Sequence, residues 1–408
     1  MAACDATVRA VEAVARTAYG RLVAFLAARS RDIAGAEDAL ADAFAAALRA
    51  WPRDGVPDRP EAWLLTVARR RLADRARHGQ VQAASATALV AQAEARTALQ
   101  APGASDFPDE RLALLFVCAH PAIDPAAHTP LMLQCVLGLD ATRIAAAFLA
   151  TPAAIGQRLA RAKAKIRTAG IRFAVPEREA LATRLPAVLE AIYAAFAAGW
   201  DDWSGADPRR RGLAEEAIFL GRLLVAHLPE AAEARGLLAL MLLAAARHPA
   251  RRDDEGAFVP LAAQDPARWQ APMIAEGMHH LARAAAAATH AATLGRFQLE
   301  AAIQAVHCIR PTDWQEIALL YEGLLAHAPT LGVHVGRAAA VGEALGPARG
   351  LALLNALEPA QAYQPYWAVR AHLLAALGHD PAAAARQAIA LADDEAVRTW
   401  LAARYRIA

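Results

Sequence analysis

The chain has 408 residues, enough for two to four domains. Hydrophobic residues make up 57% but aromatic residues only 6%, and the dominant alanine, leucine, arginine and glutamate are strong helix formers. Because no long stretch alternates apolar and polar residues, the expected fold class is all-α. The formal net charge of +2 excludes a uniformly basic or acidic protein, so the distribution of charge matters more than its sum.

Several missing sequence features indicate the cellular compartment of the protein and the kinds of chemistry it lacks. Four cysteines without a CxxC motif exclude a disulfide framework and favour a reducing cytoplasm. The N-terminus has no apolar targeting segment, and no run of 18 apolar residues is free of charges or turn signals, so no membrane span is expected. We also find no phosphate-binding glycine loop, nucleophile elbow or HExxH motif. The sequence therefore predicts a protein that is not an enzyme and needs no cofactor.

Turn and linker signals divide the chain. Residues 79–108 are rich in alanine, glutamine and serine and lack large apolar anchors, which predicts a linker. The parts on either side have helical patterns, and the first is interrupted by a proline-rich loop at 51–60. The predicted domains are residues 1–78, the linker, a compact helical unit at 109–172, and a longer helical block at 177–408.

The unit at 109–172 has the signals of a helix-turn-helix. Thr129-Pro130 is expected to open one helix, which ends at Gly138, and Asp140 is expected to cap a short second helix with Ile144 and Phe148 on its buried face. Thr151-Pro152 repeats the Thr-Pro start signal before a third helix. A short helix, a tight turn and a second helix of this kind suit a reader of the DNA major groove.

The third helix of that unit combines one apolar stripe with a basic surface. Ile155, Leu159, Ala162 and Ile166 follow helical spacing. Both lysines of the chain lie between arginines on the same helix, and no acidic residue occurs from 142 to 175. An amphipathic helix with a solvated face is the alternative, but such faces usually mix signs. The candidate DNA-contacting residues are Gln157, Arg158, Arg161, Lys163, Lys165 and Arg167.

The first part carries the most specific pattern. Ala36-Glu37-Asp38 is followed four residues on by Asp42, then by Phe44 and, after the loop, by Pro60-Glu61-Ala62-Trp63-Leu64 and an arginine-rich tail. Over some 45 residues this resembles domain two of extracytoplasmic-function sigma factors, the promoter-recognition subunits of bacterial RNA polymerase. The helix-turn-helix unit is then similar to domain four of the same family.

This resemblance assigns roles to two charged surfaces. The acidic side of the helix after 32 would dock on the basic coiled coil of core RNA polymerase, through Glu37, Asp38 and Asp42. The basic helix end would bind the melted −10 strand of promoter DNA, and the 53–59 loop would hold an extruded base. The predicted −10 residues are Arg53, Asp54, Asp58, Arg69, Arg70, Arg71, Arg75 and Arg77.

Each of these assignments has a plainer alternative. Acidic residues near a helix start and arginines near a helix end are also favoured by the helix dipole. Trp63 is more easily explained as a core residue than as a base-stacking one. Cys118, His120, His128 and Cys135 fit no standard zinc spacing, so no metal is expected.

The C-terminal block resembles the extension of one sigma-factor subgroup. Asp109-Glu110-Arg111-Leu112, Glu216-Ala217-Ile218 and Thr312-Asp313-Trp314 carry the resemblance, although Ala119, Arg143 and Gly336 depart from it. Faint repetition of small residues predicts a tetratricopeptide-like helical array, with an irregular bundle as the alternative. The extension is expected to control, within the same chain, the access of the sigma domains to polymerase or to the promoter. It also offers a surface for an unidentified regulator. The rival function is a helical-repeat interaction scaffold with a degenerate sigma-like half.

Overall fold

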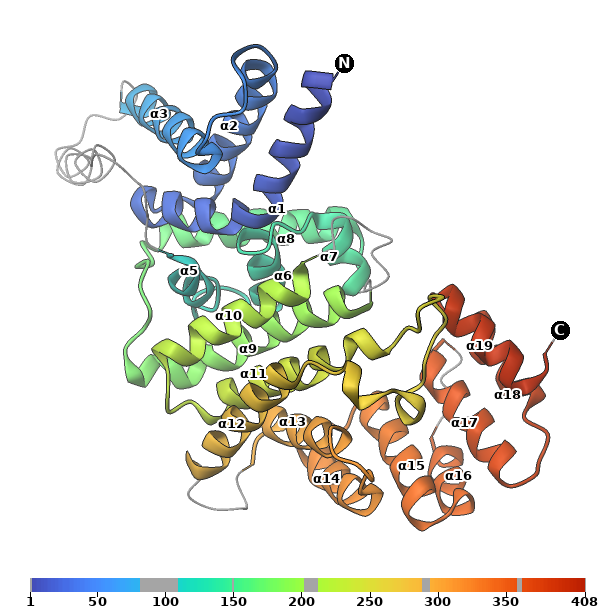
Figure 1. The fold of residues 1–408 in the computed structure, drawn as a ribbon. Helices are drawn as coiled ribbons and strands as arrows, with labels where there is room; N and C mark the ends of the chain where they lie inside the picture. The colour runs from blue at the N-terminus through green and yellow to red at the C-terminus, as the bar shows by residue number, and fades with distance from the viewer. Residues whose placement is uncertain are drawn as a thin grey trace. The chain divides into compact units, whose positions relative to one another are not determined.

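The computed structural model describes residues 2–80, 109–148, 150–201, 212–287, 294–357 and 362–407, and these are all-helical, as predicted (Figure 1). Within these ranges the one β-type pairing is a single bridge between Arg252 and Phe258. The predicted linker lies outside the described residues from residue 81 onward. The chain divides into two compact units, residues 1–220 and 221–408.

The helices follow one another with short connections. Those that begin in the first unit are α1 (Ala2–Ser30), α2 (Ile33–Asp54), α3 (Pro60–Gln80), α5 (Arg111–Cys118), α6 (Pro125–Cys135), α7 (Ala141–Ala147), α8 (Pro152–Thr168), α9 (Arg178–Asp201) and α10 (Leu213–His227). The second unit continues with α11 (Ala232–Ala246), α12 (Ala271–Ala287), α13 (Arg296–His307), α14 (Trp314–His327), α15 (Leu331–Leu345), α16 (Pro347–Asn355), α17 (Gln364–Ala376), α18 (Ala382–Ala390) and α19 (Glu395–Tyr405).

The second half of α1 is buried on every side. Residues 22–27, Leu-Val-Ala-Phe-Leu-Ala, are all at most 5% exposed. A surface helix has one apolar stripe, whereas a helix that is apolar all round belongs in a core. The neighbours of α1 explain this burial, because it contacts α2 and α3 on one side and α5 and α6 on the other. The buried stretch of α1 therefore joins α2 and α3 to α5 and α6 within the first unit.

Helix α6 begins earlier than the sequence predicts. The expected start at Thr129-Pro130 is wrong: Asp124 caps the helix by accepting a hydrogen bond from the Ala126 amide at 3.0 Å, and Pro125 takes the first helical position. Pro130 therefore lies inside α6, where it cannot donate to the Ala126 carbonyl. Arg158 of α8 donates to that carbonyl instead, at 3.3 Å. The proline thus creates an acceptor that ties α8 to α6.

The other predicted signals of this region are confirmed. Gly138 has a φ of +70° after α6, Asp140 caps α7, and Thr151 caps α8 by accepting from the Ala154 amide. The predicted apolar stripe of α8 is buried along its whole length. Phe148 is the exception, because it follows the last residue of α7 and is 38% exposed.

One described helix is long and apolar enough to span a bilayer by length and composition, over Glu179–Gly199 of α9. Its apolar residues have another explanation within the first unit. Helix α9 packs against α6 and α5, and Val188, Ile192 and Ala195 are buried at spacings of four and three. That spacing is one helix face, so the apolar character is that of a packing surface.

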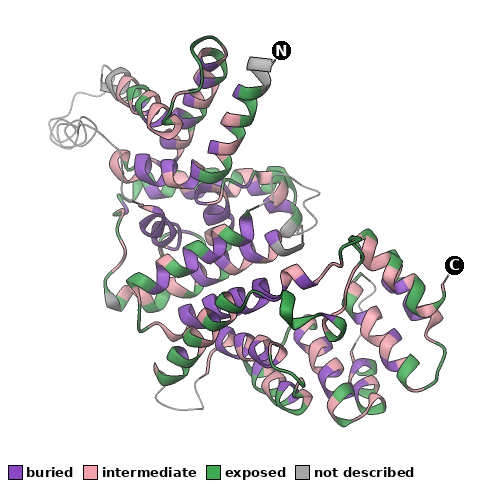
Figure 2. Ribbon diagram, viewed as in Figure 1, coloured by how far each residue is buried: buried purple, intermediate pink, exposed green. Residues whose placement is uncertain are grey.

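In the second unit each helix contacts its neighbours in the chain. Contacts run from α11 to α12 and α13, and then between successive helices from α13 to α19. Buried residues lie along the facing sides of these helices (Figure 2). Small residues permit this: Ala385 and Ala388 of α18 are fully buried. Gly336 of α15 also fits this packing, because an added Cβ would lie 2.4 Å from the Tyr321 hydroxyl oxygen.

Acid is expected to destabilise the second unit through His307. Burial, together with Arg247 and Arg310, lowers the pKa of His307 to about 4. An unfolded histidine has a pKa of about 6.5, so between these values the unfolded chain binds the proton. This contribution is complete above pH 6.5 and is lost as the pH falls toward 4, so His307 should account for about 2 kcal/mol of the stability lost between pH 7 and pH 5 in urea unfolding. His248, whose pKa burial lowers to about 3, should add a loss of its own. His307→Gln should therefore reduce the dependence by its share, whereas His379→Gln, at an exposed histidine, should leave it unchanged; equal slopes in both variants would contradict the assignment.

Candidate functional site

Helix α2 presents three predicted docking carboxylates that differ in exposure. Its apolar side, including Leu40 and Trp51, is buried in the three-helix bundle with α1 and α3. The Asp38 and Asp42 side chains are exposed by 70% and 47%, whereas that of Glu37 is only 14% exposed. Two of the three carboxylates are therefore accessible to a partner, and the third faces inward.

One predicted −10 arginine lies against this acidic surface. Arg75 of α3 forms ion pairs with Asp38 at 3.3 Å and with Asp42 at 3.1 Å. All three side chains are well exposed, so these pairs hold the helices together weakly. The structure thus brings together residues that the sequence assigned to two different partners.

The remaining predicted −10 residues spread over α3 and the loop before it. Arg70 and Arg71 are exposed, while Arg69 is partly buried and burial lowers its pKa. Arg53, Asp54 and Asp58 are exposed around the loop that follows α2. Arg77 lies in α3, but its side chain is outside the described residues.

The loop is anchored by an aromatic pair. Trp51 at the end of α2 and Trp63 in α3 meet edge to face, with ring centroids 5.5 Å apart. Trp51 is buried and Trp63 is half-buried, so Trp63 helps to hold the two helices that flank the loop. This packing fits the core interpretation of Trp63.

The predicted −35 residues of α8 point in different directions. Gln157, Arg161 and Lys165 are exposed and four residues apart, so they share one helix face. Arg158 is bonded to α6, and Arg167 lies 3.8 Å from Asp32, which precedes α2. Lys163 turns toward the bundle, where its side chain is 11% exposed. A DNA contact from the arrangement as it stands is open to Gln157, Arg161 and Lys165, and the Arg167 side chain is also 57% exposed.

Lys163 ends in a small buried polar cluster. Its Nζ donates to Oε2 of Glu37 and to Oε1 of Gln134, the latter at 2.6 Å. Tyr19 and Cys135 border the cluster, and burial, with Glu37 adding to it for Tyr19, raises the pKa of both groups. Both protonatable neighbours therefore stay neutral, so the charge of Glu37 is balanced by Lys163.

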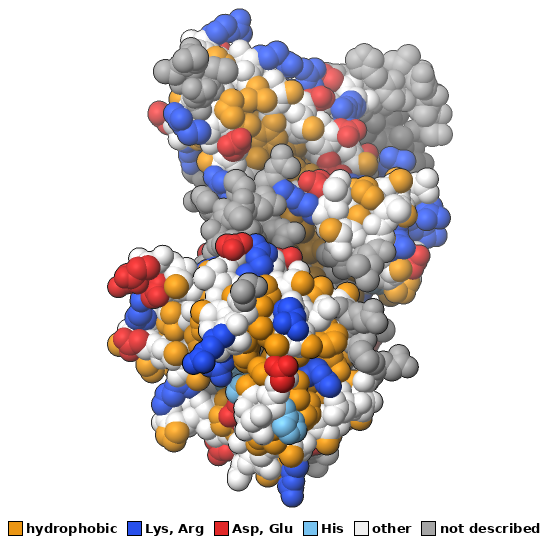
Figure 3. Space-filling view, turned by 90° about the vertical axis from the view of Figure 1, so that its right-hand side faces the viewer, with side chains coloured by type: hydrophobic (Ala, Val, Ile, Leu, Met, Phe, Trp, Pro, Cys, Tyr) orange, Lys and Arg blue, Asp and Glu red, His pale blue; other side chains and the backbone are white. Residues whose placement is uncertain are grey.

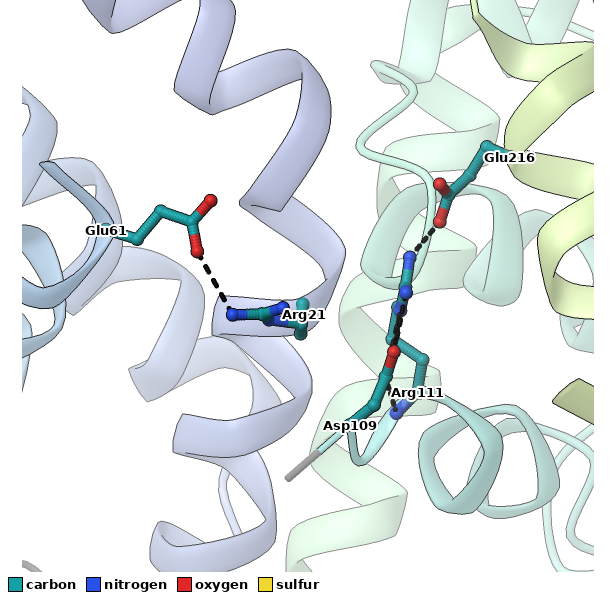
Figure 4. A network of polar contacts seen from close by, with 5 residues as sticks. All are labelled: Arg21, Glu61, Asp109, Arg111 and Glu216. Carbon is teal, nitrogen blue, oxygen red and sulfur yellow. Dashed lines mark hydrogen bonds and ion pairs between the residues drawn. The ribbon is translucent and has the colours of Figure 1, made fainter. Parts of the chain in front are cut away.

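A second buried ion network lies around Arg111, at the start of α5 (Figure 4). The guanidinium is bonded to Asp109 through Nε at 2.9 Å and through Nη2 at 2.5 Å, and Nη1 bonds Glu216 of α10. Burial alone would raise the pKa of Asp109, but hydrogen bonds from Arg111 outweigh it and the pKa is lowered. For Glu216 burial dominates and the pKa is raised despite Arg111. Arg111 thus fastens α10 to the helix that follows the linker.

The cysteines and histidines in and between α5 and α6 have contacts other than with one another as a set of metal ligands. His120 accepts from the Ala122 amide through Nδ1, and His128 Nε2 lies 3.1 Å from the Ile123 carbonyl. Cys118 and Cys135 are buried as free thiols. In the ranges that the structure describes, no three His, Cys, Asp or Glu side chains gather as metal ligands.

Two ion pairs of the site were not predicted from the sequence. The contact between Glu37 and Lys163 joins residues 126 positions apart, and that between Arg111 and Glu216 joins residues 105 apart. Neither pair has a local signal. The uninterrupted apolar run of residues 22–27 was the available hint that α1 is covered on both sides.

Basic residues are dispersed on one face of the molecule. On the face drawn in Figure 3, lysine and arginine side chains are scattered among acidic and hydrophobic ones. This fits the chain's near-zero net charge. Binding of nucleic acid through this protein would depend on local groups such as the exposed face of α8, not on an overall positive field.

Known proteins match two parts of this architecture. Residues 10–81, which contain α2, α3 and most of α1, match the family model of sigma-70 region 2. Residues 184–285, from α9 to α12, match a family of unknown function, DUF6596. No solved structure matches the chain. The chain, all-helical in its described residues, therefore has a sigma-70 region 2 at its N-terminus and a DUF6596 domain behind it.

A relative extends the match over nearly the whole chain. The uncharacterized protein R00370 of Rhizobium meliloti strain 1021 is 38% identical over 382 residues, which is 91% of this chain and 89% of that protein. The chain belongs to the same family as R00370.

Proposed function

We propose that this protein is a sigma factor that binds core RNA polymerase and directs promoter-specific transcription initiation in the cytoplasm. The observation that carries the proposal is the match of residues 10–81 to sigma-70 region 2. The exposed carboxylates of Asp38 and Asp42 support it, because they lie where the resemblance puts the polymerase-docking surface. Glu37 belongs to the same surface, and its engagement with Lys163 is treated below.

Promoter contacts are proposed on two helices. Within the region-2 bundle, α3 and the loop before it would bind the −10 strand, with Arg70 and Arg71 as exposed arginines of α3. Residues 109–172 would act as sigma domain four. Their caps, the short α7 and the exposed face of α8 support a helix-turn-helix that reads the −35 element.

The C-terminal part is proposed to regulate this activity. The extracytoplasmic-function subgroup with a tetratricopeptide-like extension is the best fit, supported by the chain-order packing of α11 to α19. Such an array offers a surface for an unidentified regulator. The alternative function is an interaction scaffold with a degenerate sigma-like half, which the departures at Arg143 and Gly336 favour.

Binding to core polymerase separates the two functions. Purified full-length protein is mixed with core polymerase from a related bacterium, and the complex is then tested for open-complex formation on a library of genomic promoter fragments. A sigma factor gives both a stoichiometric complex and melting of a defined set of promoters. If no complex forms at low or at physiological salt, the sigma proposal fails and the scaffold remains.

Removing two charges from the exposed face of α8 is expected to weaken DNA binding uniformly. In Arg161→Ala/Lys165→Ala, two phosphate-contacting cations are lost, so the slope of log affinity against log salt should fall by about 2. Binding of the purified chain to promoter duplexes at several salt concentrations measures this slope. Arg172→Ala, which removes an exposed charge beyond α8, is the control; an equal effect there would contradict a DNA-reading face on α8.

A further inference from the structure

The polar contact between α8 and α2 occupies part of the proposed docking surface. Lys163 is the partner of Glu37, and both side chains are nearly buried at 11% and 14% exposure. The second oxygen of Glu37, Oε1, is buried as well and has no hydrogen-bond partner. Oε1 of Glu37 is therefore buried and Oε2 is engaged by Lys163, so little of this carboxylate is accessible to another protein while α8 stays in place.

A close backbone contact supports the same arrangement from α1. Gly20 lies against the end of α6, so close that an added Cβ would be 1.8 Å from the Val136 carbonyl oxygen. That separation is below any van der Waals contact, and a backbone atom cannot rotate away. Only glycine allows α1 to approach α6 in this way. Beside it, the Tyr19 ring packs against Gly138, which ends the same helix turn.

A third contact, an ion pair, also joins α8 to the start of α2. Arg167, one turn beyond Lys163 on α8, lies 3.8 Å from Asp32 just before α2. Glu37 and Asp32 are thus both opposed by cations of α8. The acidic start of α2 meets the basic face of α8 with complementary charge, and the buried run of α1 supports both.

We propose that the free protein is closed, meaning that α8 packs against α2. In this closed form Lys163 pairs with Glu37 and occupies the place that a basic polymerase surface would take. Core polymerase then binds only the open form, in which α8 has left α2. This inference rests on the proposed function, since it takes Glu37 as part of the docking surface. It adds an intramolecular competitor that the sigma resemblance does not supply.

The energetics favour a switch over a permanent bond. A buried ion pair recovers little more than the cost of removing two charges from water, so it specifies the closed arrangement without making it irreversible. Removing Lys163 alone leaves Glu37 buried without a counter-charge, which drives α8 away. With an open form at about 1–10% of the free protein, opening variants should tighten the apparent affinity for polymerase roughly ten- to a hundredfold.

The chain's lysine content gives a direct measurement of closure. Lys163 and Lys165 are its only lysines; one is buried against Glu37 and the other is exposed on the same helix. Brief treatment of the full-length protein with an amine-acylating reagent, followed by mass spectrometry, should modify Lys165 roughly ten- to a hundredfold faster than Lys163, because the minor open form supplies the reactive Lys163. Lys165 serves as the internal control for reagent and helix.

Two variants should abolish closure by independent means. Gly20→Ala inserts a methyl group where the Val136 carbonyl lies, and Lys163→Met removes the cation. The matched controls are Gly156→Ala, at a helical glycine of α8 with no atom within 4 Å of an added Cβ, and Arg172→Met, at an exposed cation beyond α8. Circular dichroism checks that all four fold. We expect Lys163 to react as fast as Lys165 in Gly20→Ala, and both opening variants to bind core polymerase more tightly than the controls.

Three other outcomes are decisive. Equal acylation of the two lysines in the wild-type protein would overturn closure, whatever the polymerase result. Protection of Lys163 with unchanged polymerase affinity in both opening variants would overturn competition between α8 and polymerase. Protection of Lys163 with no polymerase binding by any variant would overturn the proposed sigma function while leaving the closed arrangement established.

Discussion

Replacing Arg111 with methionine is expected to destabilise the first unit by about 3 kcal/mol, because it leaves two partly buried carboxylates without a counter-charge. The Arg111 side chain is 7% exposed and bridges Asp109 and Glu216. It also lies over the Phe219 ring, with its central carbon 4.6 Å from the ring centroid. The change removes hydrogen bonds, charge balance and packing together. Urea unfolding followed by circular dichroism at pH 7 measures the free energy.

The neighbouring pair between Arg21 and Glu61 supplies the control for this prediction (Figure 4). Those side chains meet at 3.1 Å but are about one third exposed, so Arg21→Met should cost less than about 1 kcal/mol. Adding Glu216→Gln to Arg111→Met should restore part of the loss, since one stranded charge is removed. Equal costs for Arg111→Met and Arg21→Met would show that burial does not set the value of the Arg111 network.

Local signals in the sequence predicted the helices and their ends well where one residue decides the backbone. Asp140, Thr151 and Gly138 did so, and the stripe of α8 followed from spacing alone. The prediction of the start of α6 was wrong because two start signals lie close together. Asp124-Pro125 and Thr129-Pro130 are both good helix starts, and local chemistry does not say which of them begins the helix and which lies inside it.

The direction of charged side chains was not predictable, because it depends on packing between distant segments. Spacing placed Lys163 and Lys165 on one basic helix, but only the approach of α2 makes the first a buried partner and the second an exposed cation. Glu37 separates from Asp38 and Asp42 for the same reason. Helical periodicity gives angles around an axis, and the residues that meet across two helices follow from tertiary contacts.

Reversing the two exposed carboxylates of α2 is expected to weaken binding to core polymerase strongly. In Asp38→Arg/Asp42→Arg, two attractive charges become repulsive toward a basic partner, and like-charge contacts at an interface cost several kcal/mol. The affinity should fall by roughly a hundredfold or more at physiological salt, which corresponds to about 3 kcal/mol. The measurement is a titration of labelled core polymerase with the purified chain.

A second double variant is the control for the effect of net charge. Glu12→Arg/Glu179→Arg alters the net charge equally, at exposed positions of α1 and α9 outside the docking surface. It should bind like the wild type, because steering by net charge is screened at this salt while a docking contact is local. The reversed variant also frees Arg75 from both of its partners, so Arg75→Ala in the wild-type background belongs beside it. If Arg75→Ala binds polymerase normally and the reversed variant does not, the carboxylates themselves contact polymerase. If the reversed variant binds normally, the acidic face of α2 is not the docking surface, and the region-2 match carries the sigma proposal alone.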